Sequence, residues 1–471
     1  MKHVFIFILL IFNANYISAQ IFDVETIKFT GDTDKRINLV ILSEGYQTAE
    51  LEQFITDATN FTNDLFSQSP FSEYTNYFNV YAIRVPSNES GADHPGSATD
   101  VTEPASPIVD VDTYFNATFD AYGYHRLLYY EIDGNTANNS QAKIYSVLAD
   151  NFPNYDQALI LVNSNVYGGS GGEFPMASTG TSANEIAIHE LGHSLFDLKD
   201  EYYPGDALAA EAINMTQDNN STTVKWKNWM GINSVGIYAY GSSGIPSTWY
   251  RPHQTCKMRY LGVPFCSVCK EGMIEKIHDL ISPIDSYTPV SNSFTASTYP
   301  IDFQLNLIEP NPNTLESVWN LNATNVANDV DIISVIETDL NVGANTLTAV
   351  VNDATTFLKV DNHETIHVYT VTCTITKSAL GIDDITSEEN NLSIKLFPNP
   401  TNSIINLSLE SLYDLDLKVN IISIDGKILK TTTLSNYQNQ QIDISDLSTG
   451  IYLTNFYSNN TLVASKRIVK N

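Results

Sequence analysis

The sequence contains few cysteines and few basic residues, and each scarcity excludes a class of protein. Only four cysteines occur in 471 residues, and three of them lie between positions 256 and 269, so a disulfide scaffold is excluded. The chain has 24 basic residues against 54 acidic ones, which gives a net charge of −30. Nucleic acids and anionic membranes are bound through clustered lysine and arginine, so we expect neither as a partner.

Long apolar runs are also missing beyond the first residues. No later segment holds the roughly 18 consecutive apolar residues of a membrane span, so we expect no membrane insertion. Residues 1–19 have a basic start, a short apolar core and a small final residue, Ala19. This layout is typical of a secretory signal peptide, and the core is too short for a stable membrane anchor. We therefore expect a secreted protein.

Residues 20–283 alternate between strand and helix patterns. Buried strands are predicted at 38–43, 78–85 and 158–162. Amphipathic helices are predicted at 48–66 and 142–152. A glycine-rich segment, 168–172, precedes a predicted edge strand at 173–179. Alternation of this kind indicates an α/β (α+β) domain with a largely parallel sheet.

The remainder of the chain is strand-like. Residues 284–380 contain alternating runs separated by Asn, Asp and Gly, which favours an immunoglobulin-like β-sandwich. Residues 381–392 are polar and acidic, as in a linker, and residues 393–471 again have strand patterns. We therefore expect β-sandwich domains to follow the α/β domain.

One short motif points to chemistry: His189-Glu190-Leu191-Gly192-His193. On a helix, residues i and i+4 share a face, so the two imidazoles can bind one zinc ion from the same side. Glu190 can then act as general base for a zinc-activated water that attacks a peptide carbonyl. Gly192 is expected to leave room beside the metal. The motif predicts a secreted zinc-dependent endopeptidase that acts on extracellular proteins or peptides.

A catalytic zinc ion needs a third protein ligand and one open position. Metzincin peptidases resemble this region, and they extend the motif to H-E-x-x-H-x-x-G-x-x-H or D. Here Phe196 replaces the glycine and Lys199 the third ligand, and a protonated lysine cannot bind zinc. Asp200 is the natural replacement, and Asp197 can supply the turn because Asp tolerates positive φ. The alternatives for the third ligand are Glu201 and Glu211.

A second group of candidate residues lies between 253 and 269. Metzincins place a methionine in a tight turn beneath the zinc, a role that fits Met258, although a lone methionine also serves in core packing. Tyr260 matches a tyrosine with which some metzincins steady the oxyanion.

The cysteines of this group allow two interpretations. A disulfide from Cys256 to Cys266 or Cys269 is expected in an exported protein. Alternatively, His253 and the three cysteines bind a structural zinc ion. Cys373, in the predicted β-sandwich, is expected to be a buried free thiol. His94 and His125 lie outside the zinc motif and are interpreted as structural.

Together, these segments resemble the IgA-peptidase-like zinc metallopeptidases of gut and environmental bacteria. The resemblance rests on residues 189–194 running into 198–203. Supporting segments are 42–46, 90–95 and the Cys256-x-Met258 and Cys266-x-x-Cys269 pair. The resemblance implies a metzincin-like fold and a zinc ion held by His189, His193 and Asp200. It does not imply cleavage of IgA, because fold and site do not fix specificity.

The last 80 or so residues resemble the sorting domain of the type nine secretion system of Bacteroidetes. The resemblance rests on Phe397-Pro398-Asn399-Pro400, on the turn at 425–427 and on the basic run at 466–470. It implies the type nine secretion machinery as a partner, and a protein that is secreted or attached at the bacterial cell surface. The alternative is one more adhesive β-module.

A rival to the peptidase is a non-catalytic surface adhesin or glycan-binding protein with a degenerate peptidase-like domain. The intact His189, Glu190 and His193 favour the peptidase. In the peptidase hypothesis, the substrate lies extended along the predicted edge strand at 173–179.

Overall fold

The computed structural model describes residues 20–100, 108–130, 139–378, 385–386, 393–410, 416–434, 440–458 and 461–471. The expected signal peptide, 1–19, and most of the expected linker lie outside the described residues. The chain divides into two compact units. The first comprises Met1–Ser293, Tyr299–Ile336 and Thr346–Thr374, and the second comprises Phe294–Thr298, Glu337–Asn345 and Ile375–Asn471. The domain boundaries near 283 and 380 stay predictions. Among the described helices, none is long and apolar enough to cross a membrane.

A six-stranded sheet of order β1-β3-β2-β4-β6-β5 lies in the first unit. Its strands are β1 (Val24–Lys28), β2 (Ile37–Glu44), β3 (Phe78–Ile83), β4 (Gln157–Val162), β5 (Gly169–Ser170) and β6 (Met176–Ser178). The four inner strands run parallel, and the outer strands β1 and β5 run antiparallel to their neighbours. The prediction of a largely parallel sheet is confirmed.

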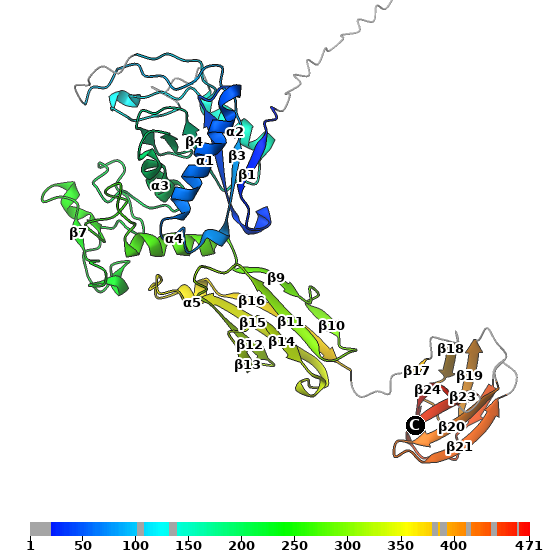
Figure 1. Cartoon of the computed structure of the whole chain (residues 1–471). Helices are drawn as coiled ribbons and strands as arrows, with labels where there is room; N and C mark the ends of the chain where they lie inside the picture. Colours follow the sequence, from blue (N-terminus) through cyan, green and yellow to red (C-terminus); the bar gives the residue numbers. More distant parts are fainter. Residues whose placement is uncertain are drawn as a thin grey trace, which may run out of the picture. The chain divides into compact units, whose positions relative to one another are not determined.

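Helices cover both faces of this sheet (Figure 1). They are α1 (Leu51–Phe66), α2 (Ser140–Asn151), α3 (Ala183–Ser194) and α4 (Ser267–Leu280). Side chains of β2 alternate between the faces: Leu39 packs in a core with α1, α3 and α4, while Val40 packs in a core with α2. A short two-stranded sheet, β7 (Tyr238–Ala239) with β8 (Tyr250–Arg251), lies between α3 and α4 in the sequence.

The predicted edge strand at 173–179 is wrong. Strand β6 lies inside the sheet between β4 and β5, and β5, from the glycine-rich segment, is the outer strand. Two residues with a glycine among them give no alternating pattern, which is why the sequence did not reveal β5. Beyond β5 the chain continues as Gly171 and Gly172, and Gly172 is exposed.

The buried Glu44 at the end of β2 orders the loops that follow the sheet. Its carboxylate accepts a hydrogen bond of 2.6 Å from Thr113 Oγ1 and bonds of 2.8 and 2.9 Å from the backbone N–H groups of Phe115 and Ala117. Gly45 has φ +69°, and a Cβ atom there would lie 1.9 Å from a carbonyl oxygen in the 90–95 segment. Residues 42–46 and 90–95, two segments on which the family resemblance rests, therefore pack against each other in the loops after β2 and β3.

Two packed sheets follow α4. Their elements are β9 (Ile284–Thr288), β10 (Ser293–Thr295), β11 (Ile301–Leu307), β12 (Leu315–Leu321), β13 (Thr324–Asn328), β14 (Ile332–Val335), β15 (Gly343–Asp353), the short helix α5 (His363–Ile366) and β16 (Tyr369–Lys377). One sheet has the order β10-β16-β15-β12-β13 and the other β14-β11-β9. Cys373 is buried and free, as predicted.

The second unit contains another pair of sheets, of orders β17-β24-β23-β20-β21 and β18-β19-β22. The strands are β17 (Ile385–Thr386), β18 (Ser393–Phe397), β19 (Ile404–Glu410), β20 (Leu417–Ser423), β21 (Ile428–Leu434), β22 (Gln440–Asp443), β23 (Gly450–Ser458) and β24 (Thr461–Lys470). Alternate apolar residues from both sheets form one core, among them Ile405, Ile421 and Phe456. Gly426, with φ +86°, makes the predicted turn, which joins β20 to β21.

Candidate metal centre

Helix α3 presents the H-E-x-x-H motif beside the sheet. Ala187, Ile188 and Leu191 are at most 1% exposed and anchor the helix in the core. Ser182 precedes the helix with φ +67°, and its side chain makes no capping hydrogen bond. The first turn is instead closed by the backbone, because the N–H of Ala183 donates to the carbonyl of residue 180.

Three candidate ligand atoms converge on one side of α3. His189 Nε2 lies 3.2 Å from His193 Nε2. Asp200 Oδ1 lies 3.1 Å from His189 Nε2 and 3.2 Å from His193 Nε2. Zinc bonds of about 2.0–2.2 Å at tetrahedral angles separate nitrogen and oxygen ligands by about 3.3–3.5 Å. The spacing and the donor types therefore fit one zinc ion.

Backbone carbonyls hold both histidines in the orientation that a metal requires. His189 Nδ1–H donates to the carbonyl of Lys257 at 2.9 Å, and His193 Nδ1–H donates to the carbonyl of Leu198 at 2.7 Å. With the proton on Nδ1, each Nε2 keeps its lone pair free and directed at the shared point.

The chain turns sharply after His193, as predicted. Asp197 has φ +57°, a left-handed conformation, and it makes the turn that a glycine makes in the metzincin motif. The N–H of Leu198 donates to the carbonyl of Gly192 at 2.9 Å and closes the turn. Asp200 thereby returns beneath the two histidines one residue later than in the metzincin pattern.

Glu190 points from α3 toward the glycine-rich segment. A Cβ atom on Gly171 would lie 2.2 Å from Glu190 Oε2, so only glycine leaves space there for the carboxylate. Burial raises the pKa of Glu190 above its usual range, and the neighbouring histidines only partly oppose this effect. The carboxylate is thus poised to accept a proton beside the three ligand atoms.

Met258 lies against α3 at the motif glycine. A Cβ atom on Gly192 would lie 2.7 Å from Met258 Sδ, and Met258 is fully buried. The glycine makes room for this sulfur, which corrects the expectation that it leaves room beside the metal. The carbonyl of Met258 also accepts the N–H of Glu201 at 2.6 Å, which joins this turn to the segment that carries Asp200.

Two tyrosines are candidates for contact with a substrate. Tyr202 was not among the predicted site residues, yet its side chain lies close enough to Asp200 for the two groups to interact electrostatically. Partial desolvation and the charges of Asp200 and Glu190 raise the pKa of Tyr202. Tyr260 is half exposed, and its ring lies 4.7 Å from the guanidinium carbon of Arg259. The position of Tyr202, two residues after the predicted ligand Asp200, could have marked it as a candidate site residue.

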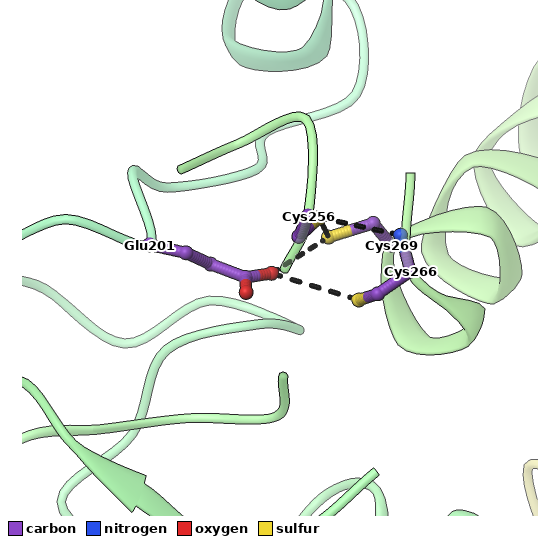
Figure 2. Close-up of side chains that lie close together, drawn as sticks. All are labelled: Glu201, Cys256, Cys266 and Cys269. Carbon is purple, nitrogen blue, oxygen red and sulfur yellow. Dashed lines mark hydrogen bonds between the residues drawn. The ribbon is translucent and has the colours of Figure 1, made fainter. Parts of the chain in front are cut away.

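The other carboxylates considered as third ligand lie elsewhere. Glu211 is exposed and pairs with Lys225 at 2.6 Å. Glu201 is fully buried and faces Cys256, Cys266 and Cys269, as Figure 2 shows. The structure thus brings Asp200, and neither alternative, to the two histidines.

All three of these cysteines are free, so the expected disulfide is wrong. His253 is not part of the cluster either: its Nδ1 accepts the N–H of Thr255 at 2.9 Å. The fourth residue of the cluster is Glu201, and not His253 as in the alternative prediction of a structural zinc site.

A second His-Glu-x-x-His run, His363 to His367, escaped notice in the sequence. Its two histidines turn their Nδ1 atoms toward Glu275 of α4, at 2.5 and 3.2 Å. Their Nε2 atoms are also bonded, to the carbonyl of Asp353 at 3.1 Å and to Asp279 Oδ1 at 2.9 Å. Glu364, the counterpart of Glu190, is exposed. The two histidines therefore take part in a network of hydrogen bonds and ion pairs that joins α5 to α4.

Comparison with known proteins identifies two segments of the chain. Residues 25–235 match the family of IgA Peptidase M64, and residues 395–471 match the secretion system C-terminal sorting domain. The first match includes the motif and Asp200 but ends before Met258 and the three cysteines. A comparison with curated proteins finds no match.

Solved structures resemble this chain only distantly. Dimeric latent PorU from Porphyromonas gingivalis is 16% identical, with a TM-score of 0.15. The match covers 33% of this chain and 14% of that protein. The fibronectin(III)-like modules of Clostridium thermocellum CbhA are 13% identical over 40% of this chain and 93% of theirs, with a TM-score of 0.15. Bacteroides ovatus SGBP-B, solved with a mixed-linkage heptasaccharide, is 8% identical over 38% of this chain and 66% of its own, with a TM-score of 0.14. Likeness this low carries no argument about fold or function.

The two family matches agree with the resemblances found in the sequence. A sorting domain of this kind indicates secretion and attachment to the cell surface in Bacteroidetes, and it implies the type nine secretion machinery as a partner. Residues 25–235 match the IgA peptidase M64 family, which suggests a peptidase domain in a chain that ends in a secretion sorting domain.

Proposed function

We propose that this peptidase is a zinc-dependent endopeptidase with a metzincin-like site, in which His189, His193 and Asp200 hold the metal. The observation that carries the proposal is the mutual spacing of 3.1–3.2 Å among His189 Nε2, His193 Nε2 and Asp200 Oδ1. Three protein ligands leave a fourth position open, as a catalytic zinc site requires.

Glu190 is the general base in this proposal. When bound, zinc polarises the scissile carbonyl and lowers the pKa of water. The Glu190 carboxylate takes a proton from the water whose oxygen bonds to the carbonyl carbon. It then gives that proton to the amide nitrogen as the C–N bond breaks, so a new carboxyl and a free amine leave the site. Its raised pKa favours the protonated form that this second step needs.

The substrate is proposed to lie beside Gly171 and Gly172 as an added strand. Gly169 in β5 is bridged to Leu127, whereas Gly171 and Gly172 follow β5 beyond that bridge, and Gly171 lies against the Glu190 carboxylate. An extended peptide can hydrogen-bond to exposed backbone at such an edge, and it would pass the general base there. This position replaces the one expected along 173–179, most of which is buried.

The test is the variant Glu190→Gln, which keeps the size of the side chain and removes its basicity. We expect it to fold, to keep zinc and to lose about 10²–10⁴-fold in the rate of cleavage of a generic protein substrate. The matched control is Glu364→Gln in the second H-E-x-x-H run, which should cleave as the wild type does. Undiminished cleavage by Glu190→Gln would sink the mechanism. Absence of cleavage by the wild type on a broad peptide library would favour the adhesin alternative.

A further inference from the structure

A buried cluster beside the candidate metal centre has no role in the proposed reaction. It consists of Glu201, Cys256, Cys266 and Cys269, each at most 6% exposed. One potential ligand atom from each lies within 4.8 Å of the others. Figure 2 shows Glu201 and Cys256 reaching from two loops toward the two cysteines at the start of α4.

The distances within this cluster are those of a tetrahedral ligand set. Cys256 Sγ lies 3.7 Å from Cys269 Sγ. Glu201 Oε1 lies 3.2 Å from Cys269 Sγ and 3.6 Å from Cys266 Sγ. Zinc–sulfur bonds of about 2.3 Å at tetrahedral angles separate two sulfurs by about 3.8 Å, and a sulfur from an oxygen by about 3.5 Å.

One oxygen atom of the cluster lacks a partner that a cation would supply. Glu201 is fully buried, and its Oε2 has no hydrogen-bond partner among the described residues. A buried carboxylate oxygen without a partner is costly. The buried Lys257 is paired with Glu185 instead, and Arg251 acts on Glu201 only through longer-range electrostatics.

Burial alone raises the pKa of the Cys266 and Cys269 thiols, an effect that a bound cation would offset. Two local features would also stabilise the thiolates that a metal binds. The backbone N–H of Cys266 donates to Cys256 Sγ at 3.2 Å, and such bonds stabilise a charged sulfur. Cys266 immediately precedes α4 and Cys269 lies in its first turn, where the helix dipole favours negative charge. None of the three forms a disulfide.

We propose that Glu201, Cys256, Cys266 and Cys269 bind a second zinc ion with a structural role. Thiolates in a tetrahedral arrangement select zinc over calcium and magnesium. Four protein ligands leave no open position, which is the property that separates a structural zinc site from a catalytic one. The proposal requires nothing of the peptidase mechanism.

Such a site would brace the first metal centre. Glu201 follows Asp200 directly, and Cys256 precedes Lys257, whose carbonyl orients His189. One ion would therefore fasten the loops that carry or orient two proposed catalytic ligands onto helix α4.

The test uses the full chain with His189→Ala and His193→Ala, which removes the first centre. We expect this variant to retain one zinc ion per chain and, after denaturation with a chelator and no reductant, to show all four cysteines as thiols. Cobalt bound in place of zinc should give thiolate-to-cobalt charge-transfer absorption, which two imidazoles and a carboxylate do not give. Adding Cys269→Ser should remove both the zinc and this absorption, whereas Cys373→Ser should leave both unchanged.

Three results would overturn the proposal. They are a double variant that holds no zinc, bound cobalt without thiolate absorption, and only two thiols on denaturation, which would mean a disulfide. Loss of proteolysis in the same variant would not bear on this site. If Cys269→Ser does not fold, the cobalt spectrum of the double variant still decides the question.

Discussion

Asp200 is the residue on which the proposed catalytic site depends most. Replacing it with alanine leaves two histidine ligands, so we expect Asp200→Ala to lose one zinc equivalent per chain. The loss of affinity should exceed the roughly 10–100-fold that is typical when only a residue supporting a ligand is removed. Elemental analysis after dialysis measures this. Glu211→Ala is the control and should keep its zinc; full occupancy in Asp200→Ala would move the third ligand elsewhere.

The role of Tyr202 can be tested by a substitution that removes only its hydroxyl oxygen. Its side chain interacts electrostatically with Asp200 and Glu190 at the candidate metal centre. If it donates to the developing oxyanion, Tyr202→Phe should lower kcat by about 10²–10³-fold with little change in KM. Tyr260→Phe is the comparison, because sequence reasoning gave the same role to Tyr260. A large loss in Tyr260→Phe alone would restore that earlier assignment.

At this scale, the sequence predicted what local spacing dictates. The positions of His189, Glu190 and His193 follow from the pitch of a helix, and the turn at Asp197 follows from the backbone preferences of aspartate. The grouping of Glu201 with three cysteines could not be predicted from local spacing. It joins residues 55 or more positions apart along the chain, and only the packing of α4 against two loops brings them together.

Helix α4 was not predicted from the sequence. Its apolar residues Val268, Met273, Ile274 and Ile277 recur at helical spacing, so the signal was present. The cysteines at its start were interpreted as part of a disulfide or a structural zinc site instead. Strand β5 gave no signal at all, since its pairing with β6 is a tertiary contact.

The network between α4 and α5 should make stability depend on pH. Burial lowers the pKa of His363, but its bond to Glu275 and the charge of that residue outweigh burial, so the pKa is raised. A raised pKa in the folded state stabilises the fold fully below the unfolded value of about 6.5 and ceases to do so as pH rises through the folded pKa. We expect the Tm difference between wild type and His363→Gln to be larger at pH 6 than at pH 9. Glu364→Gln on the same helix is the control. A difference that is constant or grows with pH would contradict this reading of the network.

At the scale of the whole molecule, the sorting domain and the proposed catalytic site belong to different parts of the chain. The sorting domain matches residues 395–471, while all residues of both proposed zinc sites lie between 189 and 269. The order of these parts was predictable, because a change from mixed α/β to purely strand-like patterns is visible without any tertiary information. The grouping into two units was not, since it depends on which strands pack together.

The central claim is that peptide cleavage depends on a zinc ion held beside Glu190. The most direct measurement is the rate of cleavage of a protein substrate by the full chain after removal of zinc with a chelator, and again after zinc is returned. Far-ultraviolet circular dichroism must be unchanged throughout, so that loss of folding is excluded. The account predicts that cleavage disappears without zinc and returns with it in the wild type, and that it does not return in Glu190→Gln. Cleavage that persists in the zinc-free chain, or that returns equally in Glu190→Gln, would contradict it.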